Sequence, residues 1–378
     1  MALKCVCPFS FTIGTVAGVY LSYPFCAQKC TYCNFASGVF PAGLETRYLD
    51  ALCAELRQHA WEWTPETVYL GGGTPSNLAP DGLRRLLEPI PGRPWIEATI
   101  EAAPGSITPE RARSWAACGI DRVSLGAQSF VEMEIRRTGR KHTARQVAVE
   151  IGILREAGIG NFNIDLIAGL AGQTEASWRE SLDWIERLGP PHVSVYMLEV
   201  DGDSRLGKEM LAGGARYGAA ETPGEDQVAA FYETAVERLA GMGIARYEIS
   251  NFARPGWESR HNLKYWRLEP YAGFGADAHS FDGRTRSAHP ESVELYLAWR
   301  ESPNALPGEA GDERHERFFV GLRLMAGIRP APEEWRRFEK PIGRFLEAGL
   351  LETEDGVLRL TNRGVLLSNE VFQEFLDL

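Results

Sequence analysis

Three cysteines lie within eight residues near the start of the chain, in the run Cys26-Ala-Gln-Lys-Cys30-Thr-Tyr-Cys33. They follow Gly18–Tyr23, which predicts a β-strand, so they stand at the strand's carboxyl end, where parallel α/β folds place their active sites. A structural zinc site usually has four ligands, and no fourth cysteine or histidine lies at normal spacing. Three thiolates suit a four-iron cluster, [4Fe-4S], whose fourth iron stays open to a ligand. Buried cysteines without a ligand remain the plainest alternative.

Three glycines end the second predicted strand, in the run Tyr69-Leu-Gly71-Gly72-Gly73-Thr74-Pro75. Bare backbone at the end of a strand lets a ligand approach closely and offers amide donors. A plain turn is the commoner explanation of such a triplet. Its place, one strand after the cysteine loop, favours a ligand site.

These motifs sit in a chain that alternates β-rich runs with amphipathic stretches from Gly18 to about Val200. Six β-then-α units imply parallel strands joined by right-handed crossovers. Such strands form either a doubly wound sheet or a barrel, and the pattern does not choose between them. The expected strands are Val19–Tyr23, Val68–Leu70, Ile96–Glu101, Arg122–Leu125, Phe162–Ile167 and His192–Leu198.

The alternation ends after about Asp201. A helix is expected over Glu225–Ala240, and the aromatic-rich block Tyr247–Phe281 has almost no regular period. From about Glu313 the sequence predicts two helices, a hairpin around Glu-Asp-Gly, and a final helix over Arg363–Leu376. This order resembles a winged-helix unit.

Composition and charge exclude several classes of protein. The 378 residues include 40 basic and 51 acidic ones, a net charge of −11, which disfavours a dedicated nucleic-acid binder. Prolines, glycines and hydroxyl residues interrupt the uncharged stretch between Lys4 and Lys29, so no transmembrane segment is expected there. We expect a cytoplasmic protein whose clustered cysteines bind metal. Residues 1–17 are expected to be an extension, in which Cys5 and Cys7 have no assigned role.

The cysteine spacing, with an aromatic residue before the last cysteine, resembles that of the radical S-adenosylmethionine (SAM) superfamily. The resemblance implies a partial (β/α)6 barrel, in which the open iron of the cluster chelates SAM. It also implies that Tyr32 lies near the adenine and that Gly72, Gly73 and Thr74 form the site for the amino group.

Further segments resemble the branch of oxygen-independent coproporphyrinogen III oxidases. They are Thr99-Ile-Glu101-Ala-Ala-Pro104-Gly105, Ser124-Leu-Gly126-Ala-Gln128-Ser-Phe130, Gly139-Arg140-Lys-His142 and Asn163-Ile-Asp165-Leu-Ile167-Ala-Gly169-Leu170. Ala103 stands where that branch usually has asparagine. Matched residue by residue, the branch implies these SAM contacts: Tyr20, Glu101, Gln128, Arg140 and Asp165.

Within this branch the chain is more similar to the heme chaperones called HemW. True oxidases carry a fourth cysteine two residues after the third, where this chain has Phe35. The run Arg260-His261-Asn262-Leu-Lys-Tyr265-Trp266 resembles their His-Asn-x-x-Tyr-Trp motif. Neutral imidazole is a normal axial ligand of heme iron, so the resemblance implies that His261 binds heme beside the flat rings of Tyr265 and Trp266. A hydrogen-bonded structural histidine is the alternative, and we expect His279 to be structural.

The resemblance implies domains at 18–240 (partial barrel), 241–312 (connecting region with the histidine motif) and 313–378 (mainly helical, winged-helix-like). The leading hypothesis is a heme chaperone with a cluster and SAM, whose partners are heme and an acceptor such as a respiratory hemoprotein. A homodimer would suit cluster loading. The alternatives are a coproporphyrinogen III oxidase, which decarboxylates porphyrinogen propionates, and a winged-helix regulator built on an inactive barrel.

Overall fold

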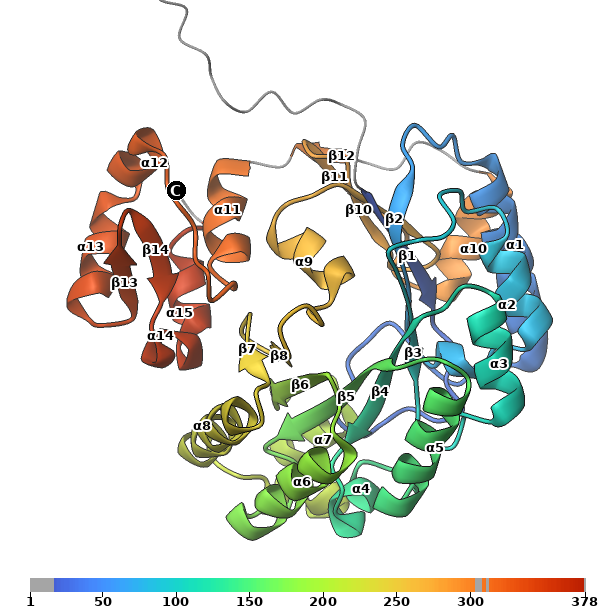
Figure 1. Cartoon of the computed structure of the whole chain (residues 1–378), viewed down its shortest axis with the longest axis horizontal. Coiled ribbons are helices and arrows are strands. Elements are labelled where there is room, and N and C mark those ends of the chain that lie inside the picture. Colours follow the sequence, from blue (N-terminus) through green and yellow to red (C-terminus); the bar gives the residue numbers. More distant parts are fainter. Residues whose placement is uncertain (1–16, 303–307, 311–312, 377–378) are drawn as a thin grey trace, which may run out of the picture.

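The computed structural model of the chain describes residues 17–302, 308–310 and 313–376. Six parallel strands form its centre, and their order in the sheet follows their order in the chain. A doubly wound sheet reverses its strand order, so the sequential order confirms the partial barrel (Figure 1). The strands are β1 (Ala17–Tyr23), β2 (Pro65–Gly72), β3 (Glu97–Ala102), β4 (Arg122–Gln128), β5 (Asn161–Ala168) and β6 (His192–Met197). Cys5 and Cys7 lie outside the described residues.

Helices cover the convex side of the curved sheet (Figure 1). The strands face them with fully buried apolar residues, such as Val68 and Leu70, against helix residues such as Leu52 and Leu182. The covering helices are α1 (Ala42–Gln58), α2 (Pro80–Leu87), α3 (Pro109–Ala117), α5 (Ala144–Glu156), α6 (Glu175–Leu188) and α8 (Glu225–Gly241). Shorter helices lie in the connections: η1 (Pro75–Asn77), α4 (Glu132–Arg137), α7 (Arg205–Leu211) and η2 (Arg216–Glu221).

The concave side of the same strands is polar. Because side chains alternate across a strand, the residues between the buried apolar ones point into the barrel. On β2 these are Thr67, Tyr69 and Gly71, and on β3 they are Glu97, Thr99 and Glu101. The strand alternation therefore separates an apolar layer under the helices from a polar interior.

Further strands extend the sheet on both sides. The strand β9 (Tyr271–Phe274) pairs in parallel with β1, and β8 (Asn251–Ala253) pairs antiparallel with β6. The remaining elements of this region are β7 (Ala245–Arg246), β10 (His279–Phe281), β11 (Thr285–Ala288), α10 (Val293–Glu301) and β12 (Gly308–Ala310). Among the described strands, the edges of this sheet are β7 and β12.

The aromatic-rich block contains more regular structure than its sequence pattern indicated. The helix α9 (Arg260–Trp266) carries the histidine motif and lies on the concave side of the sheet (Figure 1). Its first turn is held from outside the helix, since the Glu97 carboxylate accepts hydrogen bonds from the backbone N–H groups of Arg260 (3.0 Å) and His261 (2.9 Å). The Ser259 side chain caps the helix. A distant partner, rather than a local period, therefore stabilises α9.

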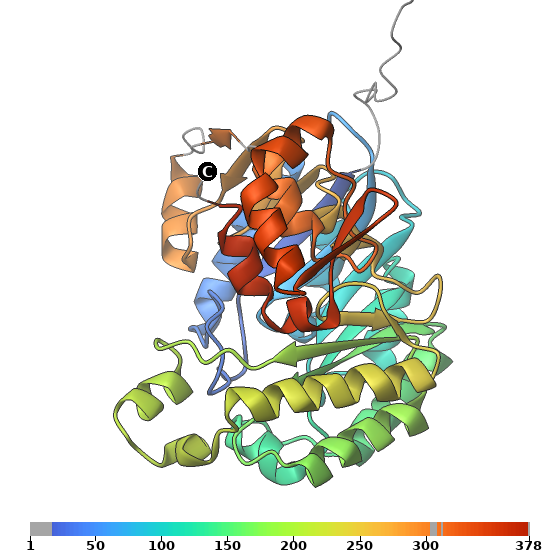
Figure 2. The ribbon, with the colours of Figure 1, turned by 90° about the vertical axis from the view of Figure 1, so that its left-hand side faces the viewer.

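The C-terminal unit combines helices with a hairpin, as predicted, and faces the viewer in Figure 2. The predicted final helix is instead two short helices that meet at Leu367. The rings of Phe318, Phe338 and Phe375 form its core, with centroids 4.5–5.3 Å apart. Its elements are α11 (Glu313–Gly321), α12 (Pro332–Arg337), α13 (Glu339–Glu347), β13 (Leu351–Glu354), β14 (Val357–Leu360), α14 (Asn362–Leu366) and α15 (Ser368–Gln373).

Across the described residues, every helix is too short or too polar to cross a membrane.

Candidate functional site

The cysteine loop between β1 and α1 is held at the carboxyl edge of the barrel by backbone hydrogen bonds. The N–H of Cys26 donates to Gly38 O (2.8 Å), and the N–H of Thr31 donates to Thr138 O (3.1 Å) in the loop after α4. All three cysteines are free and half-buried. These bonds fix the loop at its start and in its middle, and its three cysteines are partly exposed.

The surroundings of the thiols complement an anionic metal site. The Arg140 Nε–H donates to the Cys30 sulfur (3.2 Å), which places a positive charge beside it. Burial raises the pKa of the Cys26 thiol, while hydrogen bonds from Thr74 and Ser37 oppose that rise. In the part of the chain that the structure describes, no three Cys, His, Asp or Glu side chains converge as the ligands of a single metal ion would. Three thiols spread over one loop fit the corners of a larger cluster better than zinc.

The glycine run packs tightly against the cysteine loop. The Gly73 N–H donates to Tyr23 O (2.7 Å), and the Thr74 N–H donates to Phe25 O (3.0 Å). A Cβ atom on Gly73 would lie 2.7 Å from Phe25 O, so only glycine fits this position. Close backbone approach thus requires glycine at position 73, where the run meets the cysteine loop.

Glu101 occupies the barrel interior next to the glycines. Its carboxylate accepts hydrogen bonds from the Tyr69 hydroxyl (2.9 Å) and the Gly72 N–H (3.1 Å). Burial raises the pKa of Glu101 to about 7, although the Tyr69 hydrogen bond works against this shift. The carboxylate therefore changes its charge near neutral pH, at the position where a cationic or N–H-donating ligand would meet it.

Asp165 lies on the same edge, two strands from Glu101. The Asn163 amide donates to its carboxylate (2.6 Å), and Asn163 also bonds to Ser124 (2.8 Å) on β4. Burial raises the pKa of Asp165, and the Asn163 hydrogen bond lowers it. These contacts hold the carboxylate at the top of the barrel interior.

Gln128 and Arg140 complete this edge. Gln128 ends β4 with a φ of 69°, which is rare for a residue other than glycine and is typical of functional sites. The Arg140 Nη1–H donates to Gly126 O (2.6 Å), while its Nε reaches Cys30. Tyr32 lies against Arg140 and Cys30. The residues that the sequence predicted around the cluster therefore gather at one edge of the barrel, and Tyr20 stacks on Tyr69 below them (6.1 Å).

His261 lies elsewhere, at the opposite end of the strands. Its imidazole packs where a Cβ on Gly18 would lie, 3.1 Å from Cε1, whereas the cysteine loop begins after Tyr23. The two ends are roughly 15 Å apart by the rise of a strand. The predicted heme residue therefore lies below the predicted SAM residues, and Tyr69, which stacks on His261 and bonds to Glu101, joins the two groups.

The His261 ring is 1% exposed and both of its nitrogens are hydrogen-bonded. Nδ1 pairs with Thr67 Oγ1 (2.8 Å) and Nε2 pairs with the Tyr265 hydroxyl (2.7 Å), and the ring stacks on Tyr69 at 5.2 Å. Burial, together with the nearby Lys264 ammonium, lowers the pKa of His261 to about 3. The imidazole is therefore neutral at physiological pH. His279, which we expected to be structural, is exposed on β10.

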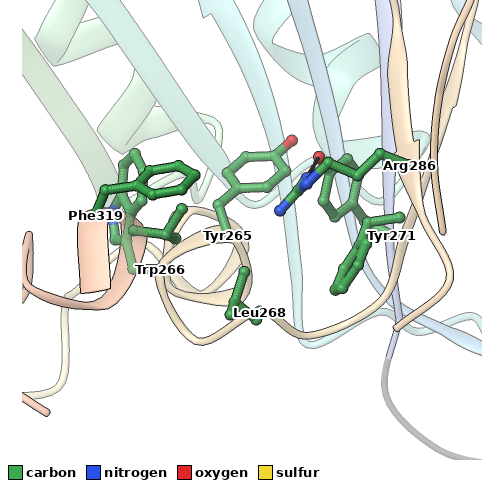
Figure 3. Close-up of a pocket in the computed structure, with 8 residues that line it drawn as sticks. Tyr265, Trp266, Leu268, Tyr271, Arg286 and Phe319 are labelled. Atoms are coloured by element: carbon green, nitrogen blue, oxygen red, sulfur yellow. Dashed lines mark hydrogen bonds between the residues drawn. The ribbon is translucent and has the colours of Figure 1, made fainter. Parts of the chain in front are cut away.

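An aromatic cleft of about 310 Å³ adjoins α9 (Figure 3). Tyr265 stands in its middle, with Trp266 and Phe319 on one side and Tyr271 and Arg286 on the other. Arg286 pairs with Glu316 on α11 through two hydrogen bonds (2.7 and 2.9 Å). We define the aromatic cleft by its lining residues Tyr265, Trp266, Leu268, Tyr271, Phe281, Arg286, Phe319 and Val320.

The sequence reading missed the residues that line the interior below the SAM edge. Tyr69 links Glu101 to His261, and Arg122 is 2% exposed at the base of β4. Tyr196 stands on the inner side of β6, near its end. The signal that could have revealed them is the period of two in each strand, because the alternate residues of β2, β4 and β6 that point inward are polar, aromatic or glycine.

Comparison with known proteins places the chain among related sequences. Residues 20–185 match the model of the radical SAM superfamily. The heme chaperone HemW of Bacillus subtilis (strain 168) is 33% identical, over 94% of this chain and 98% of that protein. HemW of Escherichia coli (strain K12) is 30% identical, over 81% of this chain and 82% of that protein. A bovine relative, the mitochondrial radical S-adenosyl methionine domain-containing protein 1, is also 30% identical, over 94% and 84%.

Among solved structures, the coproporphyrinogen III oxidase HemN of Escherichia coli superimposes with a TM-score of 0.80. The match covers 95% of this chain and 89% of that one at 22% sequence identity. At this identity the likeness concerns the fold alone.

Proposed function

The chain belongs to the HemW family of the radical SAM superfamily, and we propose that it is a heme chaperone, which binds heme and passes it to an acceptor protein. The observation that carries this proposal is a neutral, buried His261 beside an aromatic cleft, at the end of the barrel away from the cysteines. A carrier needs an iron ligand and a flat apolar surface, and this arrangement supplies both kinds of group.

Cys26, Cys30 and Cys33 would hold a [4Fe-4S] cluster. Their fixed loop, their partly exposed positions and the Arg140 guanidinium beside Cys30 support this assignment. When bound, such a cluster supplies an iron with an open coordination position.

SAM would occupy the carboxyl edge above the barrel interior. We assign its contacts to Tyr20, Tyr32, Gly72, Gly73, Thr74, Glu101, Gln128, Arg140 and Asp165. Their shared support is position, since the strand ends and the cysteine loop bring these residues to one edge. Glu101 would accept a hydrogen bond from the amino group, because its carboxylate lies beside the glycine run. Asp165 would accept hydrogen bonds from a ribose, since it is an acceptor on the far side of the same edge.

A coproporphyrinogen III oxidase is the second candidate, because HemN shares the fold. Two observations favour the chaperone instead. The position of the oxidase's fourth cysteine is taken by Phe35, whose side chain is 66% exposed in the cysteine loop. The aromatic cleft also lies beside His261, whose imidazole is a normal ligand of heme iron.

The test compares heme binding with decarboxylation in the same anaerobically reconstituted protein. We expect one heme per chain and no product from coproporphyrinogen III with SAM and reductant. His261→Ala should lose the absorbance spectrum of histidine-ligated heme while it keeps its iron and sulfide. His279→Ala is the matched comparison, because that histidine is nearby in sequence but exposed on β10. Decarboxylated product without stable heme binding would favour the oxidase over the chaperone. Loss of the spectrum only in His279→Ala would identify His279, and not His261, as the heme ligand.

A further inference from the structure

The Tyr265 side chain touches both His261 and the aromatic cleft. Its ring stands edge-on to the His261 ring (5.1 Å, 89°) and edge-on to Tyr271 on the cleft side (4.6 Å, 88°). Its hydroxyl is hydrogen-bonded to Nε2 of His261, while the Thr67 hydroxyl is hydrogen-bonded to Nδ1. In this arrangement neither ring nitrogen is available to a metal.

We propose that the aromatic cleft seats the heme macrocycle and that Tyr265 is a movable cap, which must leave Nε2 of His261 before heme iron can bind there. This inference rests on the proposed function. It adds where the macrocycle lies, which residues outside the histidine motif hold it, and which hydrogen bond must break before ligation.

The lining of the cleft matches a flat, largely apolar ligand. Its volume lies at the lower end of the range for small-molecule sites. Aromatic rings from three parts of the chain face it, and such rings gain by stacking on another π-system. The Arg286 guanidinium also lines the cleft, where it is already paired with the Glu316 carboxylate and the Tyr271 hydroxyl. The aromatic lining residues are Tyr265, Trp266, Tyr271, Phe281 and Phe319.

The cleft depends on contacts between the barrel and the C-terminal unit. Phe319 and Val320 on α11 form one wall, and the ion pair between Arg286 and Glu316 joins α11 to β11. Arg323, which follows α11, lies over the Trp266 ring at 4.5 Å. The macrocycle would therefore be held between the barrel and the C-terminal unit rather than on the barrel alone.

The surroundings of His261 favour a Tyr265 side chain that can move away over one that blocks the imidazole permanently. Thr67 fixes Nδ1, and a Cβ at Gly18 would lie 3.2 Å from that atom, so the ring is confined on the barrel side. Nε2 is thereby aimed at Tyr265, whose ring borders the open space of the cleft. Rotation of the Tyr265 side chain breaks this hydrogen bond, which is worth a factor of about 2 to 12 in an equilibrium constant, and also the edge-on contact with the His261 ring.

The test measures affinity for ferric heme and for iron-free protoporphyrin IX, which has the same macrocycle but cannot bind His261. Tyr265→Phe should bind heme about 2- to 12-fold more tightly, because the competing hydrogen bond is gone, and should bind protoporphyrin IX unchanged. Phe319→Ala should weaken both ligands roughly tenfold. Trp257→Ala is the aromatic control, since Trp257 is exposed and lies outside the cleft lining, and should change neither affinity.

A kinetic measurement on the wild type needs no substitution. Heme should bind in two phases, with stacking first and the spectral change of histidine ligation second, whereas protoporphyrin IX should show only the first phase. Loss of heme binding in a folded Tyr265→Phe variant would refute the proposal that Tyr265 must leave Nε2 of His261 before ligation. A single kinetic phase of heme binding would refute it as well. Unchanged affinities for heme and protoporphyrin IX in Phe319→Ala would refute the placement of the macrocycle in the aromatic cleft. A wild type that binds protoporphyrin IX but no heme iron would contradict the proposed function instead.

Discussion

The affinity for SAM should fall as pH drops through 7, because Glu101 must be ionised to accept a hydrogen bond from the amino group. Its pKa is raised to about 7, so the ionised fraction falls from about 0.91 at pH 8 to about 0.09 at pH 6, roughly a tenfold loss of affinity. The Tyr69 hydroxyl bonds to the ionised carboxylate at 2.9 Å. A hydrogen bond to a charged group contributes about 1.5–3 kcal/mol, so Tyr69→Phe should raise this midpoint by about 1–2 pH units.

The assay is calorimetric titration of the cluster-loaded protein with SAM between pH 6 and 9. At pH 8, Tyr69→Phe should bind SAM about two- to tenfold more weakly than the wild type. Tyr296→Phe is the matched control, because Tyr296 also donates to a buried carboxylate, that of Glu55 (2.6 Å), outside the barrel interior. Affinity that is independent of pH over this range, or an equal midpoint in the wild type and Tyr69→Phe, would refute the reasoning.

Two further predictions concern the cluster. The triple variant Cys26→Ser, Cys30→Ser, Cys33→Ser should contain neither iron nor sulfide after anaerobic reconstitution, and tightly bound zinc without sulfide in the wild type would exclude an iron–sulfur cluster. Gly73→Ala should assemble much less cluster, because its Cβ would lie 2.7 Å from Phe25 O and push the cysteine loop away. Gly152→Ala, on helix α5 with open space around it, should keep full iron and sulfide content and gain about 0.5–1 kcal/mol in the free energy of unfolding.

The core of the fold could be predicted from local pattern. Strands such as Phe162–Ile167 carry apolar side chains toward the helices, and this alternation marks them in the sequence. The choice of a barrel depended on a resemblance, because strand order is a long-range property. The helix α9 was missed because Glu97, far away in the chain, holds its first turn. The residues of the helix alone therefore do not indicate that it is stable.

The candidate site was predictable where chemistry follows a strand end. Cys26 follows β1, Glu101 stands one residue before the end of β3 and Asp165 three residues before the end of β5, so their gathering follows from parallel pairing. The burial of His261 was not predictable, since it depends on α9 entering the barrel beneath Tyr69. Nor did the sequence indicate that the Tyr265 hydroxyl would be hydrogen-bonded to Nε2 of the imidazole.

Strand β2 touches both groups of residues. Thr67 near its start bonds to His261, Tyr69 stacks on the same imidazole and bonds to Glu101, and Gly72 at its end donates to that carboxylate. Two binding sites in contact with one strand are open to thermodynamic linkage, which is reciprocal. If SAM changes the affinity for heme by some factor, heme must change the affinity for SAM by the same factor. The binding and release of heme could then be followed by measuring the affinity for SAM at the other end of the barrel.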